Sequence, residues 1–392
     1  MKVSAFPALL RLVWWAAFGL VAAGLWSPLR SAEYFVATNG NDNSAGGEAA
    51  PFRNISRAAA LVAPGDVVTV RAGTYNETVT LARAGTAAAP IVFRSVTRGA
   101  ARINGPVRIL GSYLEFSGFD VTNPNLHGIS LSGHHLTVRD NDVHDCQGNG
   151  ITAFASDHLT IEGNRLFRNG RENSNQSSGL AIYQPLAVDQ APGYHLIIRR
   201  NESFDNESRD NVRRGDLTRS TGLLLEDFRN VQTGAAPYRA ATLVENNLFY
   251  NNVGRAVIIT GSDNITVRHN TAWGNLRVRN TTTTAATNGT FTCTDSDGVR
   301  WVNNLVVTRV EADLAVFEDR TTQGTWDYNV LAIGGIVISS PAQAGFGRNN
   351  LFADPLLANP AAGDFRPTPG SIALDRGSAA ESAAVDYAGR AR

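Results

Sequence analysis

Apolar and polar residues alternate in a short phrase that recurs along the chain and ends each time at an asparagine. The copies end at Asn141, Asn164, Asn201, Asn247, Asn270 and Asn304, and Asn329 closes a degenerate seventh copy. Alternation with a period of two is typical of a β-strand, and asparagine favours the turn that follows it. The asparagines are separated by 23, 37, 46, 23, 34 and 25 residues, which indicates a basic repeat of 23 residues with insertions.

A strand-turn-strand unit of this length cannot bury its own apolar face, so the copies must stack on one another. Parallel strands stack about 4.8 Å apart, which would place the asparagines in a column that hydrogen-bonds along the axis. The sequence therefore predicts an all-β fold, a right-handed parallel β-helix. A β-propeller or a sandwich is the alternative, but propeller blades run to about 40 residues and sandwiches show no such fixed phrase.

Each repeat also carries a second short strand that opens with a small residue. These strands begin at Gly128, Gly150, Gly179, Gly222 and Ala256. If the next apolar residue of each points inward, alternation places Ser132, Phe154, Tyr183, Glu226 and Thr260 in one outward column. Two aromatic rings beside an acid are suited to holding a sugar chain. A mixed solvent-facing surface is the alternative interpretation of this column.

The two ends of the repeat array have patterns of their own. Residues 51–63 carry apolar side chains at helical spacing and are predicted to form a helix that caps the first coil. Turn-rich segments at 350–355 and 363–369 predict a C-terminal flap that closes the other end. A solenoid needs such closures because its terminal strands would otherwise expose unpaired edges.

Residues 1–32 have the pattern of a secretory signal peptide. Lys2 and Arg11 precede an apolar run from Leu12 to Leu25, and small residues follow up to Ala32. The run is short for a membrane span of about 20 residues, and an uncleaved N-terminal anchor is the alternative. We expect a secreted or periplasmic protein with no membrane partner after cleavage. Residues 33–392 would then form a single β-helix domain with loop insertions at about 170–195, 207–221 and 276–298.

The charge balance is even, with 35 Lys and Arg residues against 35 Asp and Glu residues. A net charge of zero argues against a nucleic-acid partner bound through its phosphates. Lys2 is the only lysine, so the predicted mature chain has no lysine to serve as a general base. Loss of Lys2, Arg11 and Arg30 with the signal peptide would change the net charge from 0 to −3.

Several segments resemble those of a known group of proteins. Residues 34–44, 51–55, 64–66 and 71–75 are similar to the N-terminal signature of secreted right-handed β-helix proteins of the pectate-lyase-like superfamily, in particular the family-nine polysaccharide lyases. The resemblance implies calcium-assisted β-elimination on uronate polymers, with a lysine as base and an aspartate cluster around calcium. This chain lacks that lysine and the paired-Asp-Gly pattern, so either an arginine is the base or the chemistry differs.

Charged residues concentrate between Glu207 and Arg229, next to the outward column. In a lyase, Arg219 or Arg229 would bind the uronate carboxylate. Another arginine, His195 or Tyr183 would then act as the base. Phe154, Tyr183, His195 and Arg214 are the residues that we expect to bind an acidic polysaccharide.

Two other functions remain open at this point. In a β-helix glycoside hydrolase, Glu226 or Asp227 would form a carboxylate pair with Asp210 or Asp216. Glu226 and Asp227 would not pair with each other, because neighbouring residues of a strand face opposite sides. A non-catalytic surface protein that binds glycans through the same sheet is the other alternative.

Metal and thiol chemistry are constrained by residue spacing. No histidines have the compact spacing of a transition-metal site, so no transition metal is expected, whereas calcium bound by Asp210 and backbone oxygens is left open.

Cys146 and Cys293 would lie four or five coils apart, about 20 Å along the axis. A disulfide needs Cα atoms within about 7 Å, so we predict two free thiols in a monomeric protein.

Overall fold

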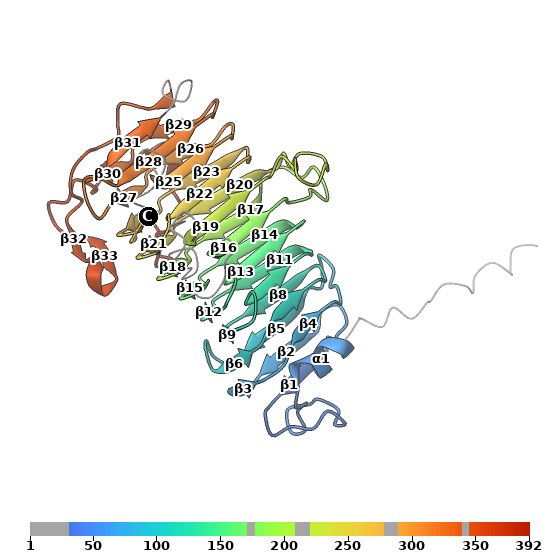
Figure 1. The fold of residues 1–392 in the computed structure, drawn as a ribbon. Helices are drawn as coiled ribbons and strands as arrows, with labels where there is room; N and C mark the ends of the chain where they lie inside the picture. Colours follow the sequence, from blue (N-terminus) through green and yellow to red (C-terminus); the bar gives the residue numbers. More distant parts are fainter. Residues whose placement is uncertain (1–30, 171–176, 208–219, 278–288, 339–344) are drawn as a thin grey trace, which may run out of the picture.

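Three long parallel sheets wind around one axis in a computed structural model that describes residues 31–170, 177–207, 220–277, 289–338 and 345–392 (Figure 1). After the first strand of sheet 1, each coil contributes one strand to sheet 1, then one to sheet 2 and one to sheet 3. This is the parallel β-helix that the repeat predicts. Among the described residues, no helix is long and apolar enough to cross a membrane.

The strands of the three sheets pair in sequence order from one end of the solenoid to the other. Sheet 1 contains β1 (Glu33–Val36), β2 (Val67–Val70), β5 (Ile91–Ser95), β8 (Leu114–Ser117), β11 (His134–Arg139), β14 (Asp157–Glu162), β17 (Tyr194–Arg199), β20 (Ala241–Glu245), β23 (Ile265–Arg268), β26 (Arg300–Val302) and β29 (Thr325–Asp327). Sheet 2 contains β3 (Gly73–Tyr75), β6 (Ala101–Asn104), β9 (Asp120–Thr122), β12 (Asp142–His144), β15 (Arg165–Phe167), β18 (Glu202–Phe204), β21 (Leu248–Tyr250), β24 (Thr271–Trp273), β27 (Leu305–Val307) and β30 (Val330–Ala332). Sheet 3 contains β4 (Val79–Leu81), β7 (Val107–Ile109), β10 (Ile129–Leu131), β13 (Ile151–Phe154), β16 (Ser177–Tyr183), β19 (Ser220–Glu226), β22 (Val257–Thr260), β25 (Gly289–Thr294), β28 (Leu314–Asp319) and β31 (Gly335–Ile338).

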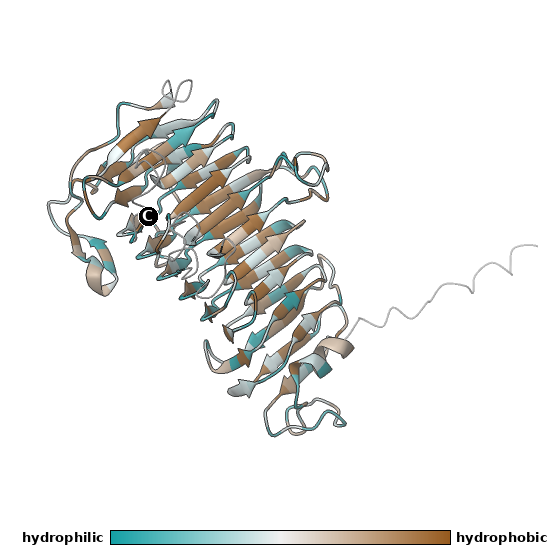
Figure 2. Ribbon diagram, viewed as in Figure 1, coloured by the Kyte–Doolittle hydropathy of each residue, from teal (hydrophilic) through white to brown (hydrophobic). Residues whose placement is uncertain are grey.

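Inward-facing apolar residues form one continuous core along the axis. Leu136, Leu159 and Leu196 are partners in successive strands of sheet 1, and all three are buried. Figure 2 shows apolar residues repeating along the strands of the solenoid. Burying one such side chain stabilises the fold by about 1.5–3 kcal/mol, so each coil gains its stability from the coils next to it.

The predicted asparagine column lies at the turn from sheet 1 to sheet 2, which we call the asparagine corner. Its members are Asn141, Asn164, Asn201, Asn247, Asn270, Asn304, Asn329 and Asn350. Oδ1 of Asn201 accepts hydrogen bonds from the backbone N–H and the side-chain amide of Asn164, both at 3.0 Å. Nδ2 of Asn201 in turn donates to the Ile161 carbonyl at 2.9 Å. The column therefore pairs polar groups that the turn would otherwise leave buried without partners.

A second asparagine column, which the sequence analysis missed, lies at the turn from sheet 2 to sheet 3. It contains Asn169, Asn206, Asn252 and Asn275, each five residues after a member of the first column. Cys146 occupies the next position in this column, and its backbone N–H donates to Asn169 Oδ1 at 3.2 Å. We call this turn the insertion corner, because the breaks in the described chain at 171–176, 208–219 and 278–288 follow its asparagines.

The two ends of the solenoid are covered in different ways. Helix α1 (Ile55–Leu61) lies within the predicted segment 51–63 and buries Ile55, Ala58 and Ala59 against the first coils. At the other end, β32 (Leu357–Asn359) and β33 (Asp364–Pro367) form a hairpin around the short helix η4 (Pro360–Ala362), and the short helix η5 (Ala379–Glu381) follows. The tail then runs back beside earlier coils, where Tyr387 donates to Glu202 at 2.6 Å. The C-terminal segment thus covers a side of the solenoid as well as closing its end.

Both cysteines are free thiols and buried, as predicted. Burial raises the pKa of Cys146 to about 12 and also raises the pKa of Cys293. We expect neither thiol to react with iodoacetamide in the folded protein, because the thiolate is the reactive form. In denaturant without reductant, mass spectrometry should show two added groups. A denatured chain that gains none would contradict the free-thiol assignment.

Candidate functional site

The predicted outward column of sheet 3 is confirmed by the strand register. Phe154, Tyr183, Glu226 and Thr260 are consecutive partners, and the column continues to Thr294 and Asp319. The strands β13, β16, β19, β22, β25 and β28 therefore align one side chain per coil on the outer face. Such a row is the arrangement on which an extended polymer can lie along the solenoid axis.

Phe154 and Tyr183 give this column its aromatic part. Phe154 is 49% exposed, whereas Tyr183 is partly buried and hydrogen-bonded with Asn149. Burial raises the pKa of Tyr183 above its ordinary value. The shift favours the protonated hydroxyl, which can donate a hydrogen bond.

Asp227 follows the column directly but turns away from it. Its backbone has φ 55° and its side chain is buried. The carboxylate accepts hydrogen bonds from Gln184 Nε2 at 2.7 Å and from the backbone N–H groups of Val231 and Gln232 at 2.8 and 3.0 Å. These bonds give Asp227 an anchoring role in the loop after β19, in place of the predicted catalytic role. Glu226 and Asp227 do face different ways, but the cause is the positive φ of Asp227 after the end of β19 and not alternation within the strand.

Arg229 is held by two carboxylates. Its guanidinium lies 2.7 Å from Asp263 and 2.6 Å from Asp297, and hydrogen bonding to Asp263 raises its pKa further. These two acids are 34 and 68 residues further along the chain, so the local sequence gave no sign of them. A guanidinium occupied in this way has little capacity to bind a uronate carboxylate as well.

Four predicted residues, Asp210, Arg214, Asp216 and Arg219, lie outside the residues that the structure describes. They fall in the segment between Glu207 and β19, at the insertion corner. Of the predicted site, the structure thus aligns Phe154, Tyr183 and Glu226 and places Asp227 and Arg229 in other interactions.

His195 belongs to a column of rings at the turn from sheet 3 to sheet 1, which we call the histidine corner. Tyr113, His135, His158 and His195 stack there with ring centres 4.4, 4.1 and 3.8 Å apart. Each of these residues directly precedes the first leucine of its repeat phrase. That shared position was the signal in the sequence that could have revealed the column.

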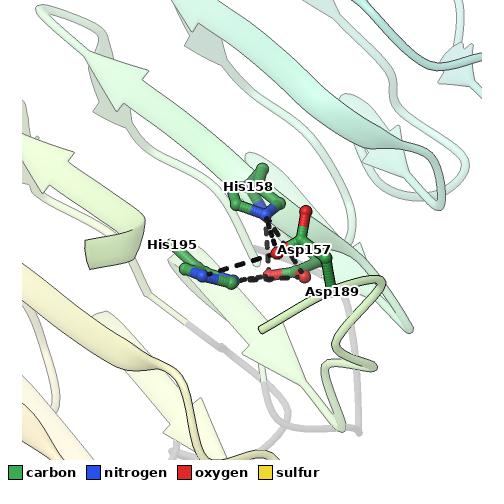
Figure 3. Close-up of side chains that lie close together, drawn as sticks. All are labelled: Asp157, His158, Asp189 and His195. Atoms are coloured by element: carbon green, nitrogen blue, oxygen red, sulfur yellow. Dashed lines mark hydrogen bonds and ion pairs between the residues drawn. The ribbon is translucent and has the colours of Figure 1, made fainter. Parts of the chain in front are cut away.

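Four side chains of the histidine corner converge, as Figure 3 shows. Asp157 and His158 open β14, His195 lies near the start of β17, and Asp189 comes from the loop between β16 and β17. One nitrogen or oxygen atom from each lies within 4.8 Å of all the others. The group mixes two imidazoles with two carboxylates, a donor set that can hold a metal ion.

Asp157 and His195, the two buried members of this group, are held in place by hydrogen bonds. Asp157 is fully buried and accepts hydrogen bonds from the Tyr238 hydroxyl at 2.6 Å and the Val188 N–H at 2.8 Å. His195 Nδ1 lies 3.0 Å from Asp157 Oδ1, and His195 Nε2 lies 2.8 Å from the Ala191 carbonyl oxygen. His195 is buried with both ring nitrogens occupied, so it does not fit the predicted roles of base or substrate ligand.

Sheet 2 also carries an outer row of rings, but its geometry differs. His144, Phe167, Phe204 and Tyr250 stack with centres 4.7, 5.0 and 4.7 Å apart and planes within 15° of parallel. Because each ring covers its neighbour's face, the row presents mainly ring edges. Phe365 of the C-terminal segment packs on Tyr250 at the end of the row. We therefore regard this row as packing between coils.

A cleft of about 810 Å³ lies between the C-terminal segment and sheet 2. Several charged residues that line it pair within the segment itself, including Arg366 with Asp364 and Arg390 with Asp386. The cleft is thus bordered by local ion pairs and, on the solenoid side, by Asn270 and Asn304 of the asparagine corner.

Comparison with known proteins gives a consistent result for the fold. Residues 34–211 match the family model described as "Pel9A-like, right handed beta helix region". The chain is 30% identical over 138 residues to "Uncharacterized protein YwoF" of Bacillus subtilis (strain 168), covering 34% of this chain and 28% of that protein. It is 24% identical over 187 residues to "Pectate lyase L" of Dickeya dadantii (strain 3937), covering 42% of this chain and 43% of that protein. The matches thus span less than half the length of these relatives.

Solved structures extend the likeness over most of the chain. The crystal structure of pectate lyase Pel9A has a TM-score of 0.53 at 15% identity and covers 91% of both chains. The complex of XylC with xylose has a TM-score of 0.51 at 12% identity, over 83% of this chain and 87% of that one. Sequence identities this low indicate a shared fold only. Residues 34–211 thus match a Pel9A-like right-handed β-helix region, and the chain as a whole has the fold of a right-handed parallel β-helix.

Proposed function

We propose that this protein is a secreted or periplasmic lyase that cleaves an acidic, uronate-containing polysaccharide by β-elimination. The observation that carries the proposal is the match of residues 34–211 to the Pel9A-like region. The shared fold with pectate lyase Pel9A and the similarity to a curated pectate lyase support it. The polymer would lie along the outer face of sheet 3, across Phe154, Tyr183 and Glu226.

The roles of these residues follow from their chemistry. Phe154 would pack its exposed face against a sugar ring, Tyr183 would donate a hydrogen bond, and Glu226 would accept hydrogen bonds from hydroxyl groups. Since Arg229 is paired with two acids, Arg219 becomes the arginine that we propose to bind the uronate carboxylate. Neutralising that carboxylate would make the neighbouring C–H more acidic, which is what β-elimination requires.

A glycoside hydrolase is the second candidate. Asp210 and Asp216, the partners expected for Glu226 or Asp227, lie outside the described residues, so only the acids of the described column can be compared with a glycosidase pair. Catalytic carboxylates of glycosidases lie roughly 5–10 Å apart. Among the described residues of the column, Glu226 and Asp319 are the two acids, and three strand steps of about 4.8 Å place them about 14 Å apart. That separation is too large for either glycosidase mechanism.

Incubation of the purified protein with pectate, alginate and other acidic polysaccharides would test the proposal. We expect the ultraviolet absorbance of an unsaturated uronate to rise with at least one polymer, together with new reducing ends. Reducing ends without that absorbance would mean hydrolysis, and neither signal with any acidic polymer would contradict the enzyme assignment. If EGTA abolishes the activity and Ca²⁺ restores it, calcium takes part; activity that resists EGTA excludes that requirement.

A further inference from the structure

The four converging side chains of the histidine corner have the spacing of metal ligands. His158 Nε2 lies 3.0 Å from Asp189 Oδ1 and 3.8 Å from Asp157 Oδ2, and His195 Nδ1 lies 3.0 Å from Asp157 Oδ1. Ligand atoms of a tetrahedral site with bonds of about 2.0–2.2 Å are about 3.4 Å apart. These three distances lie on either side of that value, and one nitrogen or oxygen atom from each of the four residues lies within 4.8 Å of all the others, so the side chains would move closer together around an ion.

The hydrogen bonds of His195 favour a cation between it and Asp157. Because Nε2 faces the Ala191 carbonyl oxygen, that nitrogen donates its proton there. In that tautomer the Nδ1 lone pair is available to a cation that Asp157, 3.0 Å away, can bind as well. A metal-bound histidine usually donates the N–H of its other ring nitrogen to a backbone carbonyl or a carboxylate, and this bond fixes the orientation of the ring.

The carboxylate ligands have similar support. The Tyr238 hydroxyl and the Val188 N–H fix the two oxygens of Asp157, and the Ala191 N–H donates to Asp189 at 2.9 Å. Ala191 thus supports one ligand through its N–H and another through its carbonyl. Outer contacts of this kind hold ligands in the orientation that a metal requires.

We propose that Asp157, His158, Asp189 and His195 bind one divalent transition-metal ion of the zinc class. Two imidazoles and two carboxylates suit such an ion, whereas calcium takes six to eight oxygen ligands. Two carboxylate charges balance the charge of the ion within a mostly buried site. Four protein ligands leave no open position, so the role is structural: the ion joins the loop between β16 and β17 to the start of β14, next to the strands that carry Phe154 and Tyr183.

The site escaped the sequence analysis because its ligands come from neighbouring coils. Asp189 lies 32 residues after Asp157, and His195 lies 37 residues after His158. Only the stacking of β14 on β17, with His158 and His195 at equivalent positions, brings them together. The expectation of no transition metal rested on compact spacing, which a solenoid does not require.

Zinc binding by the full chain tests this proposal independently of any enzymatic activity. After removal of metal with a chelator, titration calorimetry should show one Zn²⁺ bound per chain, and the melting temperature should rise with Zn²⁺ and not with Ca²⁺. Asp189→Ala should weaken Zn²⁺ binding at least about 10-fold. Asp140→Ala is the matched control, since the two side chains are 44% and 45% exposed, and it should bind as the wild type does.

Three results would overturn the proposal. The first is a wild-type chain that binds no Zn²⁺ stoichiometrically. The second is Asp189→Ala binding Zn²⁺ as tightly as the Asp140→Ala control. The third is an NMR spectrum in which His195 carries protons on both ring nitrogens in the presence of excess Zn²⁺, because that would show an imidazolium–carboxylate pair in place of a metal ligand.

Discussion

Replacing Asn201 with alanine is expected to lower the free energy of unfolding by about 2–6 kcal/mol. The substitution removes one acceptor and one donor from the middle of the asparagine corner. The backbone N–H and side-chain amide of Asn164 and the carbonyl of Ile161 would each lose a hydrogen bond in a buried place. Leaving one buried polar group unpaired costs about 1–3 kcal/mol. The side-chain amide of Asn164 keeps its hydrogen bond to the Val138 carbonyl, so the other two groups account for the expected loss.

The loss of stability can be measured by urea denaturation, with circular dichroism used to monitor unfolding. Asn125→Ala is the control, because Asn125 is exposed and a surface substitution changes stability by less than about 0.5 kcal/mol. If the chain carrying Asn201→Ala does not fold, Asn201→Ser provides a milder variant with the same direction of change. Equal stability of the Asn201 and Asn125 variants would mean that the column adds nothing to the solenoid.

Substitutions in the sheet 3 column should reduce cleavage of the acidic polymer while leaving the fold intact. Glu226→Gln is expected to lower kcat/KM about 10- to 100-fold, because a charged hydrogen bond to substrate contributes about 1.5–3 kcal/mol. Phe154→Ala is expected to lower it about 3- to 10-fold through the loss of ring packing worth about 0.5–1.5 kcal/mol. The rate of appearance of unsaturated product, measured over a range of polymer concentrations, gives both values.

The control for Phe154 is another exposed phenylalanine. Phe154 is 49% exposed and Phe352 is 61% exposed, so neither substitution should destabilise the chain strongly. Phe352→Ala should retain wild-type kcat/KM, because Phe352 lies beyond the last coil of sheet 3. If Phe352→Ala and Phe154→Ala behave alike, or if Glu226→Gln keeps full activity, the polymer does not lie on this column.

The fold could be predicted from the sequence because its determinants are local and repeated. Period-two alternation and the asparagine phrase predicted the strands, the first asparagine column and the register of Phe154, Tyr183 and Glu226. The second column, from Asn169 to Asn275, carries an equally regular signal and was simply missed. In a solenoid, a residue type that recurs at one position of the repeat becomes a column in space.

Much of the candidate site could not be predicted, because its contacts join distant parts of the chain. The partners of Arg229, Asp263 and Asp297, lie one and two coils further on. Asp227 became a loop anchor because the backbone after β19 turns through a positive φ that alternation does not foresee. The cluster at the histidine corner likewise depends on which residues of successive coils lie side by side.

The central claim is that the chain cleaves an acidic polysaccharide by elimination, in which no water is added across the broken bond. The most direct test is to let the protein cleave its substrate polymer in water enriched in the heavy oxygen isotope. The oligosaccharide products are then analysed by mass spectrometry. We predict unsaturated products in which cleavage itself has introduced no solvent oxygen. Saturated products that carry one heavy oxygen atom at each new reducing end would show hydrolysis and would contradict the account.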